Sequence, residues 1–140
     1  MTSESNIRVR YAETDQMGVV YHANYLVWFE VGRTDFIRKL GLNYLTMEKE
    51  EGCHIAVVDL RVRYKAPARY DDELTVRTRL THVRGSILSF GYVIYRAADD
   101  LILTEATTTH IVVGRDMKRT AMPPRYAAIF QSTLLNPPQL

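Results

Sequence analysis

One short segment, residues 11–25, concentrates the side chains that are able to do chemistry. It reads Tyr-Ala-Glu-Thr-Asp-Gln-Met-Gly-Val-Val-Tyr-His-Ala-Asn-Tyr and carries a carboxylate at Asp15 and an imidazole at His22. The hydrophobic period changes near His22, which predicts that a loop containing Asp15 leads directly into a long helix. The first N–H groups of a helix are unpaired and lie at the positive end of its dipole. They can therefore hold an oxyanion while a neighbouring carboxylate acts as base or nucleophile.

Each of these residues also has a purely structural interpretation. Asp15 is of a type that commonly caps helices or closes turns, and a lone histidine such as His22 often has no role. Gly18 favours the chemical interpretation, because a glycine lets the backbone approach a ligand closely. Tyr11, on the strand that leads in, is either an orienting hydroxyl or a core side chain. Because Asp15 and His22 belong to one loop-to-helix corner, their spacing favours a role for His22 beside Asp15, while both interpretations of Asp15 stay open at this point.

The elements that must position this corner follow from the hydrophobic period. Apolar side chains at helical spacing predict a long helix at about 22–40, with Gly32 placed where the backbone must approach a sheet closely. Period-two alternation predicts strands, and further apolar segments predict two shorter helices at 45–51 and after Pro123. The strands are expected at 6–11, 58–65, 74–80, 88–94 and 103–113. Short breaks between the later strands imply antiparallel neighbours, so one helix and one long antiparallel meander predict an α+β unit.

Composition restricts the class of protein. The 140 residues predict one domain over 1–140, and 46% apolar with 24% charged residues is the balance of an ordinary globular chain. No stretch approaches the ~20 apolar residues of a membrane span and the first residues carry no apolar run, so we expect neither membrane insertion nor a secretory signal. A formal charge of +2 gives no reason to expect nucleic acid binding. The single cysteine, Cys53, excludes an internal disulfide and fits a reducing, cytoplasmic location.

Other catalytic and metal-binding patterns are missing from the sequence. His54, His82 and His110 are scattered, and no pair has the close spacing of a zinc site, so we predict no metal. Cys53 and His54 are neighbours on an expected strand and should point to opposite faces, which argues against a cysteine–histidine dyad. The sequence contains no G-x-S-x-G elbow and no dinucleotide fingerprint.

The segment 10–41 resembles the signature of the 4-hydroxybenzoyl-CoA thioesterase family, in its acyl-CoA thioester hydrolase branch. The blocks Tyr-Lys-Ala-Pro at 64–67 and Arg-Tyr-Asp-Asp at 69–72 support the resemblance. It implies the hotdog fold, a curved antiparallel sheet wrapped around a long central helix. It also implies hydrolysis of an acyl- or aryl-CoA thioester to a free acid and coenzyme A, with no cofactor beyond the coenzyme A of the substrate. In such enzymes the carboxylate matching Asp15 attacks the thioester or activates water, a backbone N–H at the position of His22 polarises the carbonyl, and a tyrosine matches Tyr11.

The resemblance also suggests where the substrate binds. Gly18 would let the backbone approach the ligand, and an aromatic corner formed by Tyr21, Tyr25 and Trp28 would either hold an aromatic acyl group or pack the core. Arg84 stands in the turn where relatives gather basic residues around the nucleotide phosphates. Two other functions stay open: a non-catalytic acyl-CoA-binding protein, which would need no base, and a hotdog dehydratase or hydratase, which resembles a different histidine motif.

Two further patterns concern the sheet. Basic residues repeat along two strands, at Arg61, Arg63, Lys65, Arg77 and Arg79, and form either a solvated face or contacts to coenzyme A phosphates. A sheet wrapped around one helix leaves open edges, which predicts a homodimer joined edge to edge, and the resemblance implies a homotetramer of two such dimers. In that assembly we expect Phe90, Tyr92 and Tyr95 to have more than one face to bury against.

Overall fold

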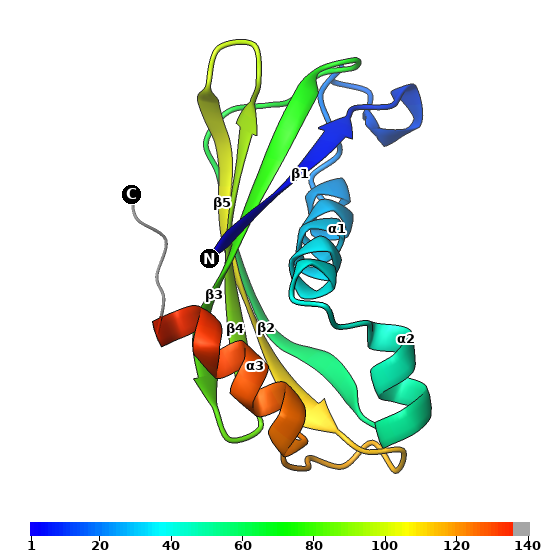
Figure 1. Ribbon diagram of the computed structural model, residues 1–140. Helices are drawn as coiled ribbons and strands as arrows, with labels where there is room; N and C mark the ends of the chain where they lie inside the picture. Colours follow the sequence, from blue (N-terminus) through cyan, green and yellow to red (C-terminus); the bar gives the residue numbers. More distant parts are fainter. Residues whose placement is uncertain (136–140) are drawn as a thin grey trace.

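The computed structural model describes residues 1–135 (Figure 1). Most of the chain is regular. The helix expected at 45–51 is confirmed as a short α-helical turn that continues into a π-helical turn at Met47–Glu51, and a 3-10 turn at Tyr11–Glu13 is an additional element. The strands are β1 (Thr2–Arg8), β2 (His54–Tyr64), β3 (Glu73–Arg84), β4 (Ile87–Arg96) and β5 (Leu101–Val113). The helices are α1 (Asn24–Lys39), α2 (Tyr44–Thr46) and α3 (Pro124–Leu135). The predicted α+β class is therefore confirmed.

The strands form one antiparallel sheet in the order β1-β3-β4-β5-β2. The meander is confirmed for β3, β4 and β5, but the expectation that β2 also belongs to it is wrong, because β2 pairs with β5 at the opposite edge. The connection from β2 to β3 does not make a tight turn. It packs against the segment that leads into α1, where Ala68 is fully buried and its carbonyl accepts the N–H of Val20 at 2.9 Å.

The first strand also lies earlier than the sequence predicts. β1 ends at Arg8, which pairs with Glu73, the first residue of β3. The next residue, Val9, bonds to the turn before β3, through its N–H to the carbonyl of Asp72 and its carbonyl to the N–H of Asp71, both at 3.0 Å. Tyr11 consequently stands in the 3-10 turn and not on the strand. This turn redirects the chain toward α1.

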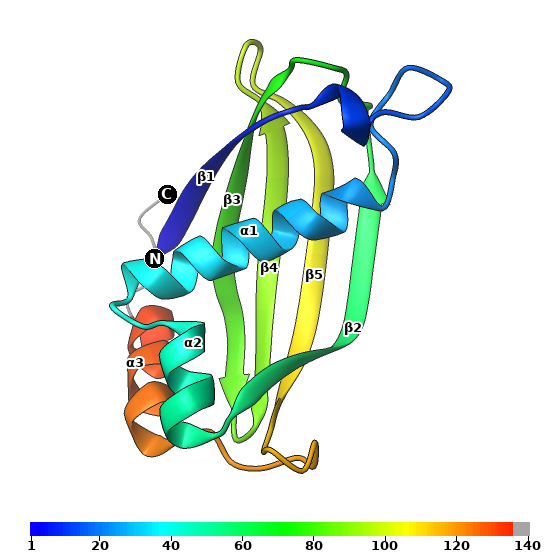
Figure 2. The same ribbon diagram turned by 90° about the vertical axis from the view of Figure 1, so that its right-hand side faces the viewer.

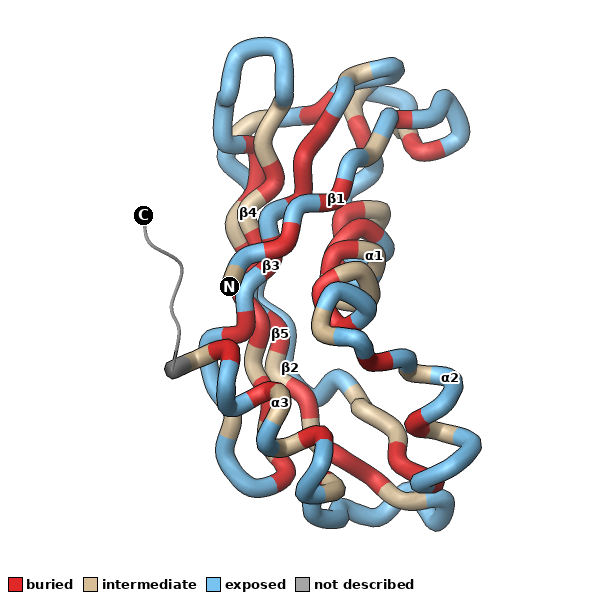
Figure 3. The backbone as a smooth tube through the Cα atoms, viewed as in Figure 1, coloured by how far each residue is buried: buried red, intermediate tan, exposed pale blue. Residues whose placement is uncertain are grey.

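Helix α1 lies across one face of the sheet, with its first turn near β2 (Figure 2). Figure 3 shows buried positions of α1 on the side that faces the strands. The buried residues of the helix are Tyr25, Trp28, Phe29, Gly32, Phe36 and Ile37. The predicted close approach at Gly32 is confirmed, since an added Cβ would overlap Thr78 Oγ1 and lie 2.9 Å from Val76 Cγ1. The backbone of α1 therefore packs directly against side chains of β3 at this point.

Two of the three strand aromatics do not need a second subunit for burial. Phe90 and Tyr92 are 0% and 2% exposed within one protomer. Phe90 packs edge-on against Phe36, and the Tyr92 hydroxyl receives a hydrogen bond from Arg33 of α1 at 3.1 Å. The expectation that these aromatics have a further face to bury is wrong for both, because α1 already covers them.

Candidate active site

A pocket of about 310 Å³ lies where the Asp15 loop, the start of α1 and the end of β2 meet. Its walls combine one carboxylate, one imidazole and several apolar side chains. The residues are Asp15, Met17, Val19, Val20, His22, Tyr25, Tyr64, Lys65, Ala66 and Pro67. The structure thus brings together Asp15 from the loop, His22 from the turn before α1 and Tyr25 from the first turn of the helix.

The Asp15 loop is a closed turn that leaves part of its carboxylate free. The N–H of Asp15 donates to the carbonyl of Val19 at 2.8 Å, and the N–H of Gly18 donates back to the Asp15 carbonyl at 3.0 Å. Asp15 Oδ1 accepts the N–H of Met17 at 2.8 Å. Within residues 1–135, Asp15 Oδ2 has no hydrogen-bond partner. The structural and chemical interpretations of Asp15 are therefore compatible, since one oxygen closes the turn and the other faces no protein donor.

Gly18 contributes through its backbone conformation. Its φ of +77° lies in the left-handed region, which glycine adopts without the steric cost that a Cβ imposes. Gly18 belongs to the loop but does not line the pocket wall. Its role in the geometry is to close the turn that presents Asp15.

In the described residues, the turn that leads into α1 carries a backbone N–H without an acceptor. Asn24 N–H donates to the carbonyl of Tyr21 at 2.9 Å, whereas the N–H of His22 has no acceptor in the described part of the chain. The His22 ring packs against Tyr21, with ring centroids 4.6 Å apart, and edge-on to Tyr64 at 6.4 Å. No hydrogen bond joins the His22 ring to Asp15 in residues 1–135. The arrangement therefore offers a carboxylate and a helix N-terminus side by side, not a carboxylate–histidine dyad.

Tyr64 is a pocket residue that the sequence did not single out as one. Its hydroxyl donates to the carbonyl of His22 at 2.8 Å and so ties the end of β2 to the start of α1. Partial burial raises the pKa of Tyr64 above its ordinary value, so the hydroxyl keeps its proton at neutral pH. The only sequence signal for this residue is its place at the start of the Tyr-Lys-Ala-Pro block.

The aromatic corner is mainly a wall of the core. Tyr25 and Trp28 are each 2% exposed and pack edge-on, with centroids 5.0 Å apart. Burial raises the pKa of Tyr25, whose hydroxyl accepts the N–H of Ala68 at 3.2 Å. Tyr25 still lines the pocket, but Tyr21 is 49% exposed and does not.

A buried carboxylate at Glu13 fixes the loop to the helix. Its side chain accepts the N–H of Arg10 at 2.8 Å and the indole N–H of Trp28 at 3.1 Å. Its carbonyl accepts the N–H of Tyr21 and the side-chain amide of Asn24, both at 2.8 Å. The carboxylate and the carbonyl of Glu13 thus both hold the loop against the start of α1. The sequence carries no sign of this role, because nothing in the hydrophobic pattern marks an acidic residue as buried.

Two predicted site residues lie away from the pocket. Tyr11 is 78% exposed and packs edge-on against Tyr70, with centroids 5.7 Å apart. Arg84 is exposed in the β3–β4 turn, at the end of the sheet opposite to the Asp15 loop (Figure 2). Within one protomer neither residue reaches Asp15.

No group of three metal-ligating side chains occurs in residues 1–135. The buried histidine, His110, has its Nε2 2.8 Å from Thr108 Oγ1, and desolvation lowers its pKa to about 3. It is therefore a neutral core residue. None of the helices in the described chain is both long and apolar enough to cross a membrane.

Comparison with known proteins identifies the family of the chain. A family model described as the thioesterase-like superfamily matches residues 9–130. The putative acyl-CoA thioesterase YneP of Bacillus subtilis (strain 168) is 48% identical over 114 residues, which cover 81% of each chain. The acyl-CoA thioester hydrolase YbgC of Escherichia coli O6:H1 is 36% identical over 126 residues, which cover 89% of this chain and 92% of YbgC.

The fold agrees with a solved structure over nearly the whole chain. The DHNA-CoA thioesterase from Staphylococcus aureus superposes with a TM-score of 0.91 at 34% identity, covering 96% of this chain and 91% of that one. The long helix crossing a curved antiparallel sheet is the arrangement that the resemblance implied. The chain therefore has the hotdog fold and belongs to the thioesterase-like superfamily.

Proposed function

We propose that this protein hydrolyses an acyl-CoA or aryl-CoA thioester to a free acid and coenzyme A, with Asp15 as base or nucleophile. One observation carries the proposal: within residues 1–135 Asp15 has one oxygen held in its turn and one oxygen without a donor, and it lines the same pocket as His22, whose N–H has no acceptor in that range. Two relatives that match this chain over most of their length carry the names putative acyl-CoA thioesterase and acyl-CoA thioester hydrolase, which supports the activity.

The chemistry requires only these two groups and water. Asp15 removes a proton from water as the water oxygen attacks the thioester carbonyl, and the negative charge that develops on the carbonyl oxygen is held by the N–H of His22. The C–S bond then breaks, and the leaving thiolate takes the proton from Asp15. In the alternative route Asp15 itself attacks, the thiolate leaves, and water hydrolyses the resulting anhydride.

The imidazole of His22 has a secondary part in this proposal. The N–H that faces the oxyanion belongs to the backbone and exists with any side chain at this position. The ring, held between Tyr21 and Tyr64, helps to place the carbonyl in the pocket. Tyr64 fixes the same peptide through the His22 carbonyl.

The acyl group is proposed to lie against the apolar part of the pocket. Val20, Tyr25 and Pro67 line it, and the pocket lies at the lower end of the volumes usual for small-molecule sites. The named substrate of the S. aureus neighbour, DHNA-CoA, agrees with the aryl alternative, while the names of YneP and YbgC specify only acyl-CoA. Aryl and short aliphatic acyl groups are therefore both candidate substrates.

The working unit is proposed to be a dimer joined through β2. This strand lies at the edge of the sheet, and four of its apolar side chains are 41–54% exposed: Val57, Val58, Leu60 and Tyr64. Pairing of β2 with β2 of a second copy around a two-fold axis would cover these side chains and satisfy the open edge. Because Tyr64 also lines the pocket, the second copy would then complete the site. Two such dimers are proposed to form a tetramer.

Incubation with a panel of acyl-CoA thioesters tests the function. Release of free thiol is followed with a thiol reagent, and enoyl-CoA absorbance is recorded in parallel. We expect thiol release that is lost in Asp15→Asn. Binding of acyl-CoA without thiol release would identify a non-catalytic binder, and a change in enoyl absorbance without thiol release would identify a dehydratase or hydratase. The buried thiol of Cys53, the only cysteine, is the basis for proposing a reducing, cytoplasmic location.

A further inference from the structure

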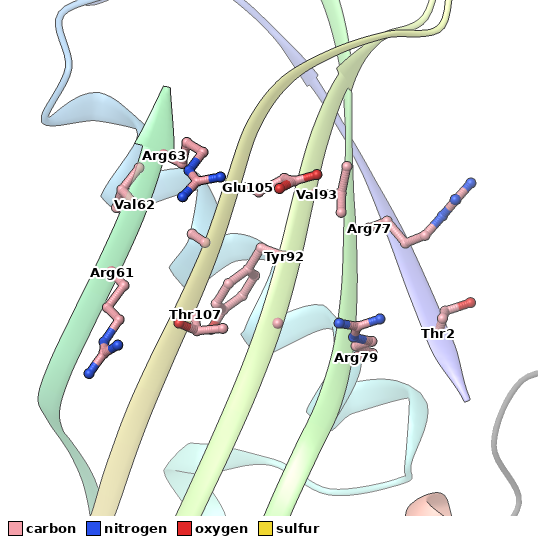
Figure 4. Close-up of a pocket in the computed structure, with 12 residues that line it drawn as sticks. Thr2, Arg61, Val62, Arg63, Arg77, Arg79, Tyr92, Val93, Glu105 and Thr107 are labelled. Carbon is pink, nitrogen blue, oxygen red and sulfur yellow. The ribbon is translucent and has the colours of Figure 1, made fainter. Parts of the chain in front are cut away.

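A trough of about 610 Å³ lies on the face of the sheet that α1 does not cover. Val76 and Thr78 of β3 contact Gly32 of α1, so Arg77 and Arg79, which alternate with them, point to the other side. Figure 4 shows the trough from this side, with α1 behind the strands. It is thus separate from the pocket that contains Asp15.

The trough has two basic walls and a low floor. Arg61 and Arg63 of β2 form one wall, and Arg77 and Arg79 of β3 form the other. The floor lies on β4 and β5, where Gly91, Val93 and Thr107 are small or short. Glu105 of β5 also lies on the floor, opposite Arg63 in the strand register. The walls are three strand spacings apart, about 14 Å.

Two of the four arginines have their charge compensated by neighbours. Arg77 donates to Glu4 at 2.9 Å, which raises the pKa of the arginine, and Arg61 lies 3.5 Å from Asp59. The only acidic residue in the lining, Glu105, is paired with Lys65 at 3.1 Å. The acidic side chains around the trough are therefore already engaged.

The other two arginines, Arg63 and Arg79, have no carboxylate partner in residues 1–135. Arg63 leans from β2 toward β5 (Figure 4). Arg79 lies over Gly91, where an added Cβ would be 3.1 Å from its Nε. A glycine in the middle of a strand weakens the strand. Its presence at position 91 therefore indicates that the Arg79 guanidinium needs the space that a side chain at this position would fill.

The geometry points to a second binding site in this trough, for a small anion that carries several phosphate groups. Guanidinium groups bind phosphate oxygens in pairs of parallel hydrogen bonds, and the volume is in the range of small-molecule sites. A ligand with several phosphate groups offers oxygens to both Arg63 and Arg79, whereas a single phosphate fills little of a trough of about 610 Å³. A second copy of this face is a poor occupant, because two arginine-walled troughs would repel each other.

Isothermal titration of the intact protein with inorganic tripolyphosphate tests the site without using turnover, so it stands apart from the thioesterase proposal. We expect binding that weakens at least about tenfold in Arg63→Gln/Arg79→Gln, since two charge-assisted contacts are lost. The matched control, Arg38→Gln/Arg125→Gln, removes the same charge from α1 and α3 and should bind as the parent does. Gly91→Ala keeps every charge but crowds Arg79, and should also weaken binding.

A second measurement distinguishes the two sources of such phosphates. If the trough holds the nucleotide end of a bound coenzyme A, Arg63→Gln/Arg79→Gln raises KM for an acyl-CoA but not for the same acyl group on N-acetylcysteamine. If it holds a separate phosphorylated compound, KM is unchanged for both and tripolyphosphate still binds in the presence of coenzyme A. Absence of tripolyphosphate binding at about 0.1 M salt, or equal weakening in the control pair, would overturn the site.

Discussion

Substitutions at Asp15 separate the turn-forming oxygen from the reactive one. Asp15→Asn keeps an oxygen that accepts the Met17 N–H but removes the negative charge. Turnover should fall by about two to four orders of magnitude, the scale of lost acid–base catalysis, which corresponds to roughly 3–5 kcal/mol in the barrier. The melting temperature should change by less than about 1 °C, because no hydrogen bond is lost. Acyl-CoA should still bind.

Asp15→Ala is the matched comparison. It removes the charge and also leaves the Met17 N–H without its acceptor. Because Met17 is 78% exposed, water replaces part of the bond, and the cost should be at the low end of about 0.5–1.5 kcal/mol. For a domain of this size that is a lowering of the melting temperature by about 1–4 °C.

Thiol release gives the turnover of both variants, and circular dichroism gives their melting curves. Near-normal turnover in Asp15→Asn would mean that Asp15 only closes the turn, and the proposed mechanism would be wrong. Equal melting temperatures for Asn and Ala, both below the parent, would instead contradict the assigned role of Oδ1.

Four further outcomes follow from the same structure. His22→Ala should lower turnover less than Asp15→Asn, because the backbone N–H remains; a larger loss with folding intact would make the imidazole the principal group. Tyr64→Phe should lower turnover modestly, by about tenfold or less, since it frees the His22 carbonyl from one neutral hydrogen bond. The depressed pKa of His110, about 3 against an ordinary 6.5, means that only the unfolded chain takes up this proton as the pH falls, so the unfolding free energy should decrease from pH 6.5 toward 3. Urea titrations across this range should show a weaker decrease in His110→Leu, and an identical slope would contradict the assignment. Light scattering after size exclusion should give at least a dimer, and a mass near 16.1 kDa at micromolar concentration would refute the shared site.

Sequence reasoning succeeded where one local pattern determines the result. The helical spacing of apolar residues predicted α1, and the mid-helix glycine at Gly32 predicted its contact with the sheet. The Asp15 loop was recognisable because the residue types of a turn and of a catalytic corner stand next to each other in sequence.

It failed where partners come from distant parts of the chain. The place of β2 beside β5 depends on how 65–72 packs against the segment before α1, which no period reveals. The burial of Glu13 depends on Trp28, a full helix turn beyond the loop. Tyr11 alternates correctly with the strand before it, but the strand ladder ends at Arg8, and alternation does not mark where a ladder stops.

Because α1 touches the sheet closely at Gly32, a small tilt of the helix about this contact displaces its first turn. Gly32 is eight positions beyond Asn24, the first residue of α1, which is about 12 Å along a helix at 1.5 Å per residue. A tilt of about 5° around this contact would therefore move the start of the helix by about 1 Å, a displacement on the scale that can cost a factor of about 100 in rate. A methyl group added at Gly32, under the middle of the helix and far from any substrate, would consequently be felt as a misplacement of the His22 N–H relative to Asp15.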